Sequence, residues 1–262
     1  PRILNLDPPM SLKGDAQEKY LRFVQRLNAE HAELRPGESD LEARIQSFEL
    51  AARMQISAKE ALDISQESAA TLKMYGIGQP ATEEFGKRCL IARRLVERGV
   101  RFVELSCLNQ NIGAGHAPNP WDQHGKIKEG HGAMANQVDQ GIAALIRDLK
   151  QSGLLEDTLV VWGGEFGRTP KINNDGGRDH WGPCFTGLFA GAGVQGGKVI
   201  GRSDEIAAYP DTVAFSPDDI GATIYSALGI DPGSVVHDRL GRPVHLNTGS
   251  VIEPLYSGSD LT

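Results

Sequence analysis

The sequence predicts an α/β fold with a mostly parallel sheet flanked by helices. Between residues 82 and 229, helical periodicity and short apolar runs alternate along the chain. This alternation is typical of parallel sheets built from strand and helix units. The region before it is helical in pattern and shows no such alternation. We therefore expect a helical region at residues 1–78, packed on an α/β domain at residues 79–262.

The helical region is expected to hold three helices after an irregular segment at residues 1–14. From Asp15, apolar residues recur with helical spacing. Pro36 and Gly37 break this pattern, and Ser39 or Asp40 can cap a second helix. Residues 57–72 form a shorter helical stretch. These helices carry no chemistry that we identify, and their charged residues are expected on solvated faces.

The α/β domain is expected to begin with a helix at residues 83–97, followed by a strand at residues 100–105 whose faces alternate. A helix at 134–150, strands at 158–162 and 186–190, and a helix at 218–228 follow. Ser216 and Pro217 form the cap and first turn of that last helix. Residues 106–131 lack apolar periodicity. Irregular stretches this long are usually functional, so we expect this one to contribute to a site.

Composition excludes several classes of protein. The 262 residues carry a net charge of −7 and no Lys/Arg-rich run, which argues against a nucleic-acid partner. No apolar run approaches the roughly 20 residues that span a bilayer. Three widely spaced cysteines form no CxxC motif, so free thiols are expected. There is no GxSxG motif, and the chain opens at Pro1 without methionine, as expected of a trimmed or mature fragment.

Acidic and imidazole side chains gather in three separate loops that contain, in order, Asp122-Gln123-His124, Glu165 and Asp179-His180. Carboxylates and imidazoles together are the ligands of zinc, manganese or iron. No HExxH-type pattern places two of them on one helix face. The alternative is a salt-bridge network with ordinary loop histidines, because such clusters also form ion pairs. Both interpretations stay open, as does a role for His116 and His131 as outer ligands or proton carriers.

Two arginines flank these acids. Arg168 and Arg178 could bind a phosphate or sulfate group by forked hydrogen bonds. They could equally form structural ion pairs with Glu165 or Asp179, because both uses match the guanidinium fork. Trp121 and Trp181 are expected to pack in the protein, with the wall of a pocket as the alternative.

The motif Gly164-Glu165-Phe166-Gly167-Arg168-Thr169-Pro170, followed by Gly177-Arg178-Asp179-His180-Trp181, resembles a large bacterial family. This is domain-of-unknown-function family 1501, which is abundant in planctomycetes. The motifs at residues 121–124, 153–158, 191–201 and 216–225 resemble the same family, so the similarity covers nearly the whole chain.

The resemblance implies a relation to the alkaline phosphatase and sulfatase superfamily. It therefore implies a divalent cation (Zn, Mn, Ca or Fe) and a small-molecule or polysaccharide ester as substrate. Asp122 and His124 correspond to the first metal motif and His180 to a late ligand that Asp179 would orient. Glu165 stands where that superfamily has Asp-His, and Arg168 or Arg178 would stabilise the transferred group. The resemblance also implies a periplasmic or secreted location.

One departure limits this comparison. In that superfamily the nucleophile and one metal-binding aspartate follow the first strand, whereas the start of this chain is helical in pattern. The chain therefore resembles an alkaline-phosphatase-like domain that lacks its N-terminal part. A metal-dependent hydrolase of phosphate or sulfate esters is the leading hypothesis. A non-catalytic extracytoplasmic scaffold with the same fold, and a metal-dependent peptidase or lyase, are the alternatives.

Overall fold

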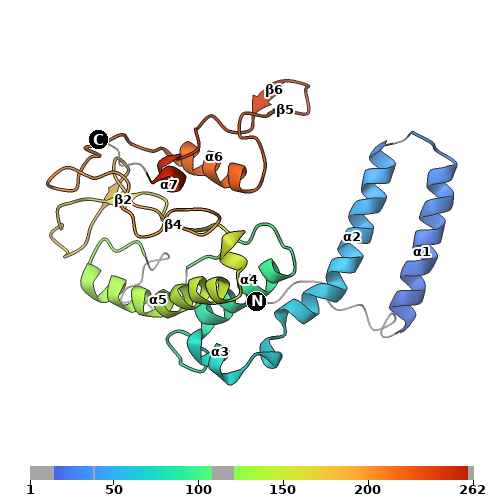
Figure 1. The fold of residues 1–262 in the computed structure, drawn as a ribbon, viewed down its shortest axis with the longest axis horizontal. Helices are drawn as coiled ribbons and strands as arrows, with labels where there is room; N and C mark the ends of the chain where they lie inside the picture. The colour runs from blue at the N-terminus through green and yellow to red at the C-terminus, as the bar shows by residue number, and fades with distance from the viewer. Residues whose placement is uncertain (1–14, 38, 108–120, 259–262) are drawn as a thin grey trace. The chain divides into compact units, whose positions relative to one another are not determined.

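A computed structural model describes residues 15–37, 39–107 and 121–258 (Figure 1). The chain divides into two compact units, Pro1–Glu67 and Ser68–Thr262. The first is a helical hairpin, and the second contains the residues of the predicted site.

The first unit consists of the antiparallel helices α1 (Asp15–Glu33) and α2 (Ser39–Leu62), followed by a 3-10 turn at Ile64–Gln66 (Figure 1). Asp15 and Glu18 lie in the first turn of α1, where acidic side chains complement the helix dipole. The separate helix predicted at residues 57–72 is wrong. No glycine or proline interrupts the chain before Leu62, so α2 continues to that residue.

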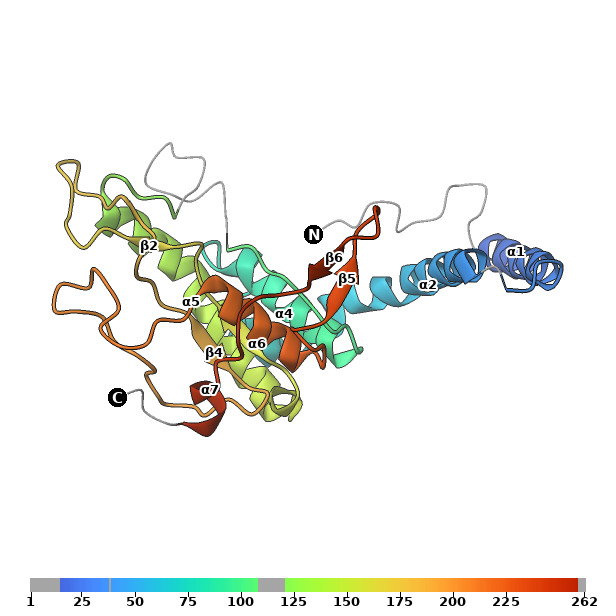
Figure 2. The same cartoon turned by 90° about the horizontal axis from the view of Figure 1, so that it is seen from above.

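The core of the second unit is formed by α4 (Glu83–Glu97) and α5 (Ile127–Gln151), which pack along each other (Figure 2). The short helix α3 (Ala69–Met74) precedes them. Four apolar side chains of these two helices are at most 1% exposed: Cys89, Leu90, Met134 and Leu149. The helix predicted at residues 83–97 is confirmed as α4. The helix predicted at 134–150 is confirmed, although α5 begins seven residues earlier, at Ile127.

A buried polar group joins three of these elements. Tyr75 follows α3 and is fully buried, and its hydroxyl donates to Asp148 Oδ2 on α5 at 2.9 Å. Arg93 of α4 forms an ion pair with the same carboxylate at 3.0 Å. Burial, followed by the hydrogen bond to Asp148, raises the pKa of Tyr75 far above its ordinary value. The tyrosine is therefore a neutral donor that fixes α3 against α5.

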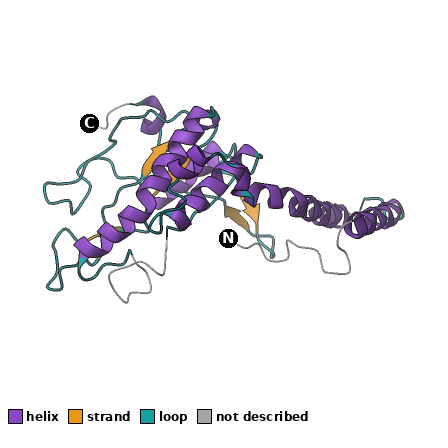
Figure 3. Cartoon of the chain, turned by 90° about the horizontal axis from the view of Figure 1, so that it is seen from below, coloured by secondary structure: helices purple, strands orange, loops and turns teal. Residues whose placement is uncertain are grey.

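The strands of the second unit form no parallel sheet, so the predicted fold class is wrong. Within the described residues there are three two-stranded sheets, all antiparallel. The strands β1 (Val160–Trp162) and β4 (Leu188–Ala190) form one pair, β2 (Gly167–Arg168) and β3 (His180–Trp181) the second, and β5 (Val235–His237) and β6 (Pro243–His245) the third. Figure 3 shows how far helices outweigh these strands.

The error has an identifiable cause. Parallel neighbours need a crossover connection, usually a helix, and the chain between β1 and β4 contains none. These two strands therefore pair antiparallel. Residues 100–105, where the sequence predicts a strand, form no ladder with any described residue, and Phe102 is 60% exposed. The predicted strand–helix–strand unit would have joined residues 100–105 to β1 through α5. Because residues 100–105 form no ladder with described residues, β1 has no parallel neighbour there.

The C-terminal part contains α6 (Pro217–Ala227) and the short α7 (Pro254–Ser257). The predicted start of α6 is confirmed, because Ser216 and Asp219 form a reciprocal capping box with proline in the first turn. Among the described helices, none combines the length and the apolar character that crossing a membrane requires.

Candidate metal centre

The site lies where two loops of the second unit meet. One loop leads into α5 and carries Asp122 and His124, and the other connects β2 to β3. Lys126 adopts a left-handed conformation (φ 48°) at the start of α5, and its N–H donates to Asp175 O at 3.1 Å. Arg178 N–H donates to Gln123 O at 3.0 Å. These backbone bonds hold the loops together, so they place residues over fifty positions apart in one cluster.

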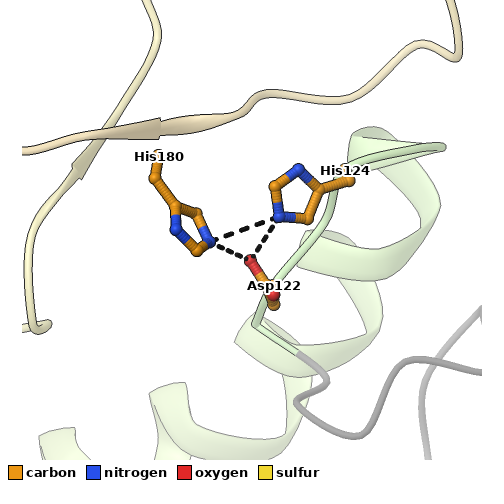
Figure 4. Close-up of side chains that lie close together, drawn as sticks. All are labelled: Asp122, His124 and His180. Atoms are coloured by element: carbon orange, nitrogen blue, oxygen red, sulfur yellow. Dashed lines mark hydrogen bonds and ion pairs between the residues drawn. The ribbon is translucent and has the colours of Figure 1, made fainter.

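Asp122, His124 and His180 form this cluster (Figure 4). One ligand atom from each lies within 4.8 Å of the other two. His124 Nε2 is 3.0 Å and His180 Nε2 is 2.8 Å from Asp122 Oδ1. The two Nε2 atoms are 3.3 Å apart. Tetrahedral ligands with bonds of about 2.0–2.1 Å stand roughly 3.3 Å from one another. The three side chains could therefore hold a metal ion with small adjustments.

The hydrogen bond on the far side of His124 makes this arrangement informative. Its Nδ1 lies 2.7 Å from Asp179 Oδ1. A carboxylate only accepts hydrogen bonds, so Nδ1 carries the proton. In the neutral ring, Nε2 then directs a lone pair at the Asp122 carboxylate and at His180. This position is satisfied either by a second proton on His124 or by a cation between the three groups.

Arg168 contacts the cluster from β2. Its Nη1 donates to Asp122 Oδ1 at 2.6 Å, and its Nη2 donates to Glu165 Oε1 at 3.2 Å. Glu165 therefore pairs with Arg168 and is not among the three converging residues. The guanidinium also lies over the ring of Phe166, 5.4 Å from its centroid. The ring of Phe166 in turn packs at a tilt of 49° against that of His180, with 4.6 Å between ring centroids.

The charges in the cluster shift several pKa values. The hydrogen bond to Asp179 is the main cause that raises the pKa of His124 above its ordinary value. Burial acts to raise the pKa of Asp122, but hydrogen bonds from His180 and Arg168 outweigh it and leave this pKa lowered. The hydrogen bond from His124 lowers the pKa of Asp179. Both carboxylates are therefore ionised at neutral pH, and the site attracts cations.

The cluster is open to solvent. The side chains of His124 and His180 are 47% and 50% exposed, and that of Asp122 is 29% exposed. An ion in the solvent can therefore reach the ligand atoms without rearrangement of the core. Three protein ligands would leave room for water or a substrate beside the ion, as in catalytic rather than structural metal sites.

The profile of a family described as "Protein of unknown function (DUF1501)" matches residues 1–256. The chain belongs to the DUF1501 family. No curated protein and no solved structure matches it. The resemblance to this family is confirmed, whereas its relation to the alkaline phosphatase and sulfatase superfamily is not shown.

Other predicted residues of this DUF1501 protein are not among the three converging residues. Arg178 donates from Nη1 to Thr169 O at 2.8 Å. His131 lies inside α5, not in a loop, with its edge against Trp121 and with Nδ1 buried without a hydrogen-bond partner. Burial, followed by the charges of Arg168 and Arg178, lowers the pKa of His131. His116 falls outside the described residues.

Both tryptophans pack in the DUF1501 structure, as expected. The indole N–H of Trp121 donates to Cys107 O at 2.9 Å, and that of Trp181 donates to Ala208 O at 2.6 Å. Trp181 also meets the ring of Tyr209 edge to face. These contacts fix the residues beside Asp122 and His180 and engage the N–H of each indole within the protein.

Sequence reasoning missed two residues of the site and misassigned a third. Asn173 hydrogen-bonds Asp179 and the backbone of His124. Gly177 lies so close to His124 that a side chain would not fit. Asp179 orients His124, whereas the resemblance implied that it orients His180. The turn-forming run Asn173-Asn174-Asp175-Gly176-Gly177 is the only signal in the sequence that could have indicated this tight contact.

Proposed function

We propose that Asp122, His124 and His180 hold one divalent cation, and that the protein is a metal-dependent hydrolase of phosphate or sulfate esters. The observation that carries the metal part is the direction of the His124 lone pair. Asp179 fixes the proton on Nδ1 at 2.7 Å, which leaves Nε2 to face a carboxylate oxygen 3.0 Å away. A cation at this position would use all three groups at once, whereas a second proton on His124 would satisfy only its contact with Asp122.

The donor atoms bear on the identity of the cation. Two imidazoles and one carboxylate suit zinc, iron or manganese, whereas calcium prefers a shell of oxygen atoms. Calcium is therefore the least favoured of the four ions that the resemblance implied. The same set of donors also holds iron(II) in oxygen-activating enzymes, so metal analysis precedes any assignment of chemistry.

The hydrolase part rests on the proposed relation to the alkaline phosphatase and sulfatase superfamily and on Arg168. A bound cation would polarise an ester oxygen and lower the pKa of a water molecule to about 7. Arg168 is 16% exposed and already directs its guanidinium at the cluster. It can stabilise charge that develops on a phosphoryl or sulfuryl group beside the cation. Arg178 is less suited, because its Nη1 donates to the carbonyl of Thr169.

A non-catalytic extracytoplasmic scaffold is the second candidate. Within the described part of the chain, none of the three cluster residues is hydrogen-bonded to a serine, threonine or cysteine side chain. The nearby Thr169 hydroxyl donates to Lys171 O at 3.0 Å and accepts from Asp179 N at 3.1 Å. It is therefore engaged in the loop. If the protein is a hydrolase, the lack of a hydroxyl or thiol hydrogen-bonded to the cluster in the described residues favours water as the attacking group.

Metal analysis of the purified protein tests the metal proposal. The chain is stripped with a chelator, reloaded separately with zinc, manganese or iron(II), and analysed by mass spectrometry. We expect one ion per wild-type chain and none in His180→Ala. His245→Ala is the matched control, because His245 is an exposed histidine on β6. Absence of a bound ion in the wild type, or equal loading of both variants, would overturn the proposed site.

Hydrolysis is measured on the same samples with 4-nitrophenyl phosphate and 4-nitrophenyl sulfate. We expect release of 4-nitrophenol from the loaded wild type and from His245→Ala, and none from His180→Ala. A protein that holds the ion but cleaves neither ester would leave the metal site in place and favour the scaffold.

A further inference from the structure

The side chain of Asn173 forms four hydrogen bonds beside the cluster. Its Nδ2 donates to His124 O at 2.9 Å and to Asp179 Oδ1 at 3.2 Å. Its Oδ1 accepts from Asp175 N at 3.0 Å and Gly177 N at 2.9 Å. The oxygen and the nitrogen of this amide therefore bond different parts of the site. The oxygen closes a turn of its own loop, and the nitrogen reaches the other loop.

The bonds of Nδ2 bear on His124 in two ways. One fixes the backbone carbonyl of His124, and the other fixes the carboxylate that accepts the proton of its ring. Asp179 Oδ1 thus receives two donors, His124 Nδ1 at 2.7 Å and Asn173 Nδ2 at 3.2 Å. Its backbone N–H is also held, by Thr169 Oγ1 at 3.1 Å. A carboxylate fixed by several partners has one orientation, so the imidazole bonded to it has one as well.

We propose that Asn173 is a positioning residue that acts through Asp179 to hold His124 with Nδ1 protonated and Nε2 facing Asp122 and His180. Asn173 touches none of the three proposed ligand atoms and acts on them only through other residues. The inference rests on the proposed metal centre for its purpose, but not for its geometry. Outer partners of this kind alter metal affinity by about 10–100-fold when removed.

The test uses Asn173→Ser. A serine hydroxyl can still accept from the N–H two residues on and keep the turn, but it removes the amide donor that reaches Asp179 and His124. Asn174→Ser is the matched control, because the neighbouring Asn174 is exposed and its side chain forms no hydrogen bond within the described part. The change is neutral in charge, so it does not alter the attraction of the site for cations.

Two quantities are measured. Titration calorimetry with Zn²⁺ is expected to show a dissociation constant about 10–100-fold higher for Asn173→Ser and unchanged for Asn174→Ser. Long-range ¹⁵N spectra of histidine-labelled protein without metal report the tautomer. We expect the Nδ1–H form of His124 in the wild type and in Asn174→Ser, and a mixture with the Nε2–H form in Asn173→Ser. A loss of stability alone does not change a tautomer.

The failures of the two proposals are distinguishable. If the wild type binds no metal ion, the metal centre is overturned, and the tautomer alone decides the role of Asn173. If zinc binds but Asn173→Ser keeps both the affinity and the tautomer of the wild type, the positioning role is overturned. Should Asn173→Ser fail to fold, Asn173→Thr with Asn174→Thr as its control gives the same neutral comparison. The threonine hydroxyl can also accept in the turn, and it lacks the amide donor.

Discussion

The close approach of the two loops at Gly177 gives a sharp prediction. A methyl group at position 177 would stand 2.0 Å from the carbonyl carbon of His124 and 2.3 Å from Gly125 N. Carbon atoms in contact lie about 3.5–4.0 Å apart. Gly177→Ala therefore forces the loops apart by roughly 1.5 Å if contact is to be relieved. The displaced atoms belong to the backbone, so rotation of a side chain cannot absorb the strain.

The effect on metal binding follows from how strict coordination is. Distances in a metal site hold to within about 0.2 Å, and a shift of His124 several times larger removes its Nε2 from the cluster. We expect Gly177→Ala to weaken Zn²⁺ binding by at least about 10–100-fold, the range seen when a ligand loses its orientation. Overpacking of this kind also costs about 1–3 kcal/mol of stability. The expected fall in Tm is about 2–12 °C, at about 2–4 °C per kcal/mol.

Gly182→Ala is the matched control. Gly182 follows β3, and a methyl group there would meet no atom within 4 Å. We expect its zinc affinity and Tm to match the wild type. Titration calorimetry measures the affinity and differential scanning fluorimetry the Tm. A Gly177→Ala protein with wild-type values of both would refute the loop geometry on which the site is built, and an equal loss in both variants would show that the effect is not local.

Three further predictions concern pH, the core and the thiols. The pKa of His124 is raised, and its proton competes with a cation, so zinc affinity should fall as the pH falls. The fall should begin above the ordinary histidine pKa of about 6.5 and amount to about tenfold per pH unit for each displaced proton. Calorimetry between about pH 6 and 8.5 measures this dependence, and a flat profile would contradict it. Tyr75→Phe should lower the free energy of unfolding by about 1.5–3 kcal/mol, because it removes a buried hydrogen bond to a charged group. Denaturant unfolding measures this change. Tyr209→Phe is the control, because Tyr209 is exposed. Burial raises the pKa of Cys89 to about 12. Ellman's reagent at about pH 8 should therefore leave this thiol unmodified until the protein is unfolded. Rapid labelling of Cys89 in the native protein would contradict its burial.

The sequence predicted helices better than sheets, and the reasons are local. The residues of α4 carry helical spacing and end before a glycine, and α6 has a cap that Ser216 and Asp219 form within one turn. Both signals lie inside the element that they specify. The partner of β1 is not specified in this way. Its apolar run predicts a strand but does not indicate whether the neighbouring strand is parallel or antiparallel. The pairing of Val161 with Phe189 depends on how the chain between them folds back.

The candidate site shows the same division. Residue types indicated that Asp122, His124 and His180 belong together, because imidazoles and carboxylates in irregular loops are typical of metal sites. The sequence left open whether Glu165 is a metal ligand or an ion-pair partner of an arginine, and only the fold places its carboxylate 3.2 Å from Arg168. The role of Asp179 depends likewise on the direction of one ring. A sequence shows which chemistry each side chain is capable of. Which neighbouring side chain it contacts is decided by the fold.

The turn at residues 173–177 connects these two levels. Its asparagine and glycines are ordinary turn formers in the sequence, yet the fold uses the asparagine amide to orient a carboxylate and the missing side chain of Gly177 to let two loops touch. The site is therefore built on backbone proximity rather than on a large sheet. This explains how three candidate ligands can converge from the loop before α5 and from the two-residue strand β3. It also places the most sensitive positions in the turn, away from the atoms that would bind the cation.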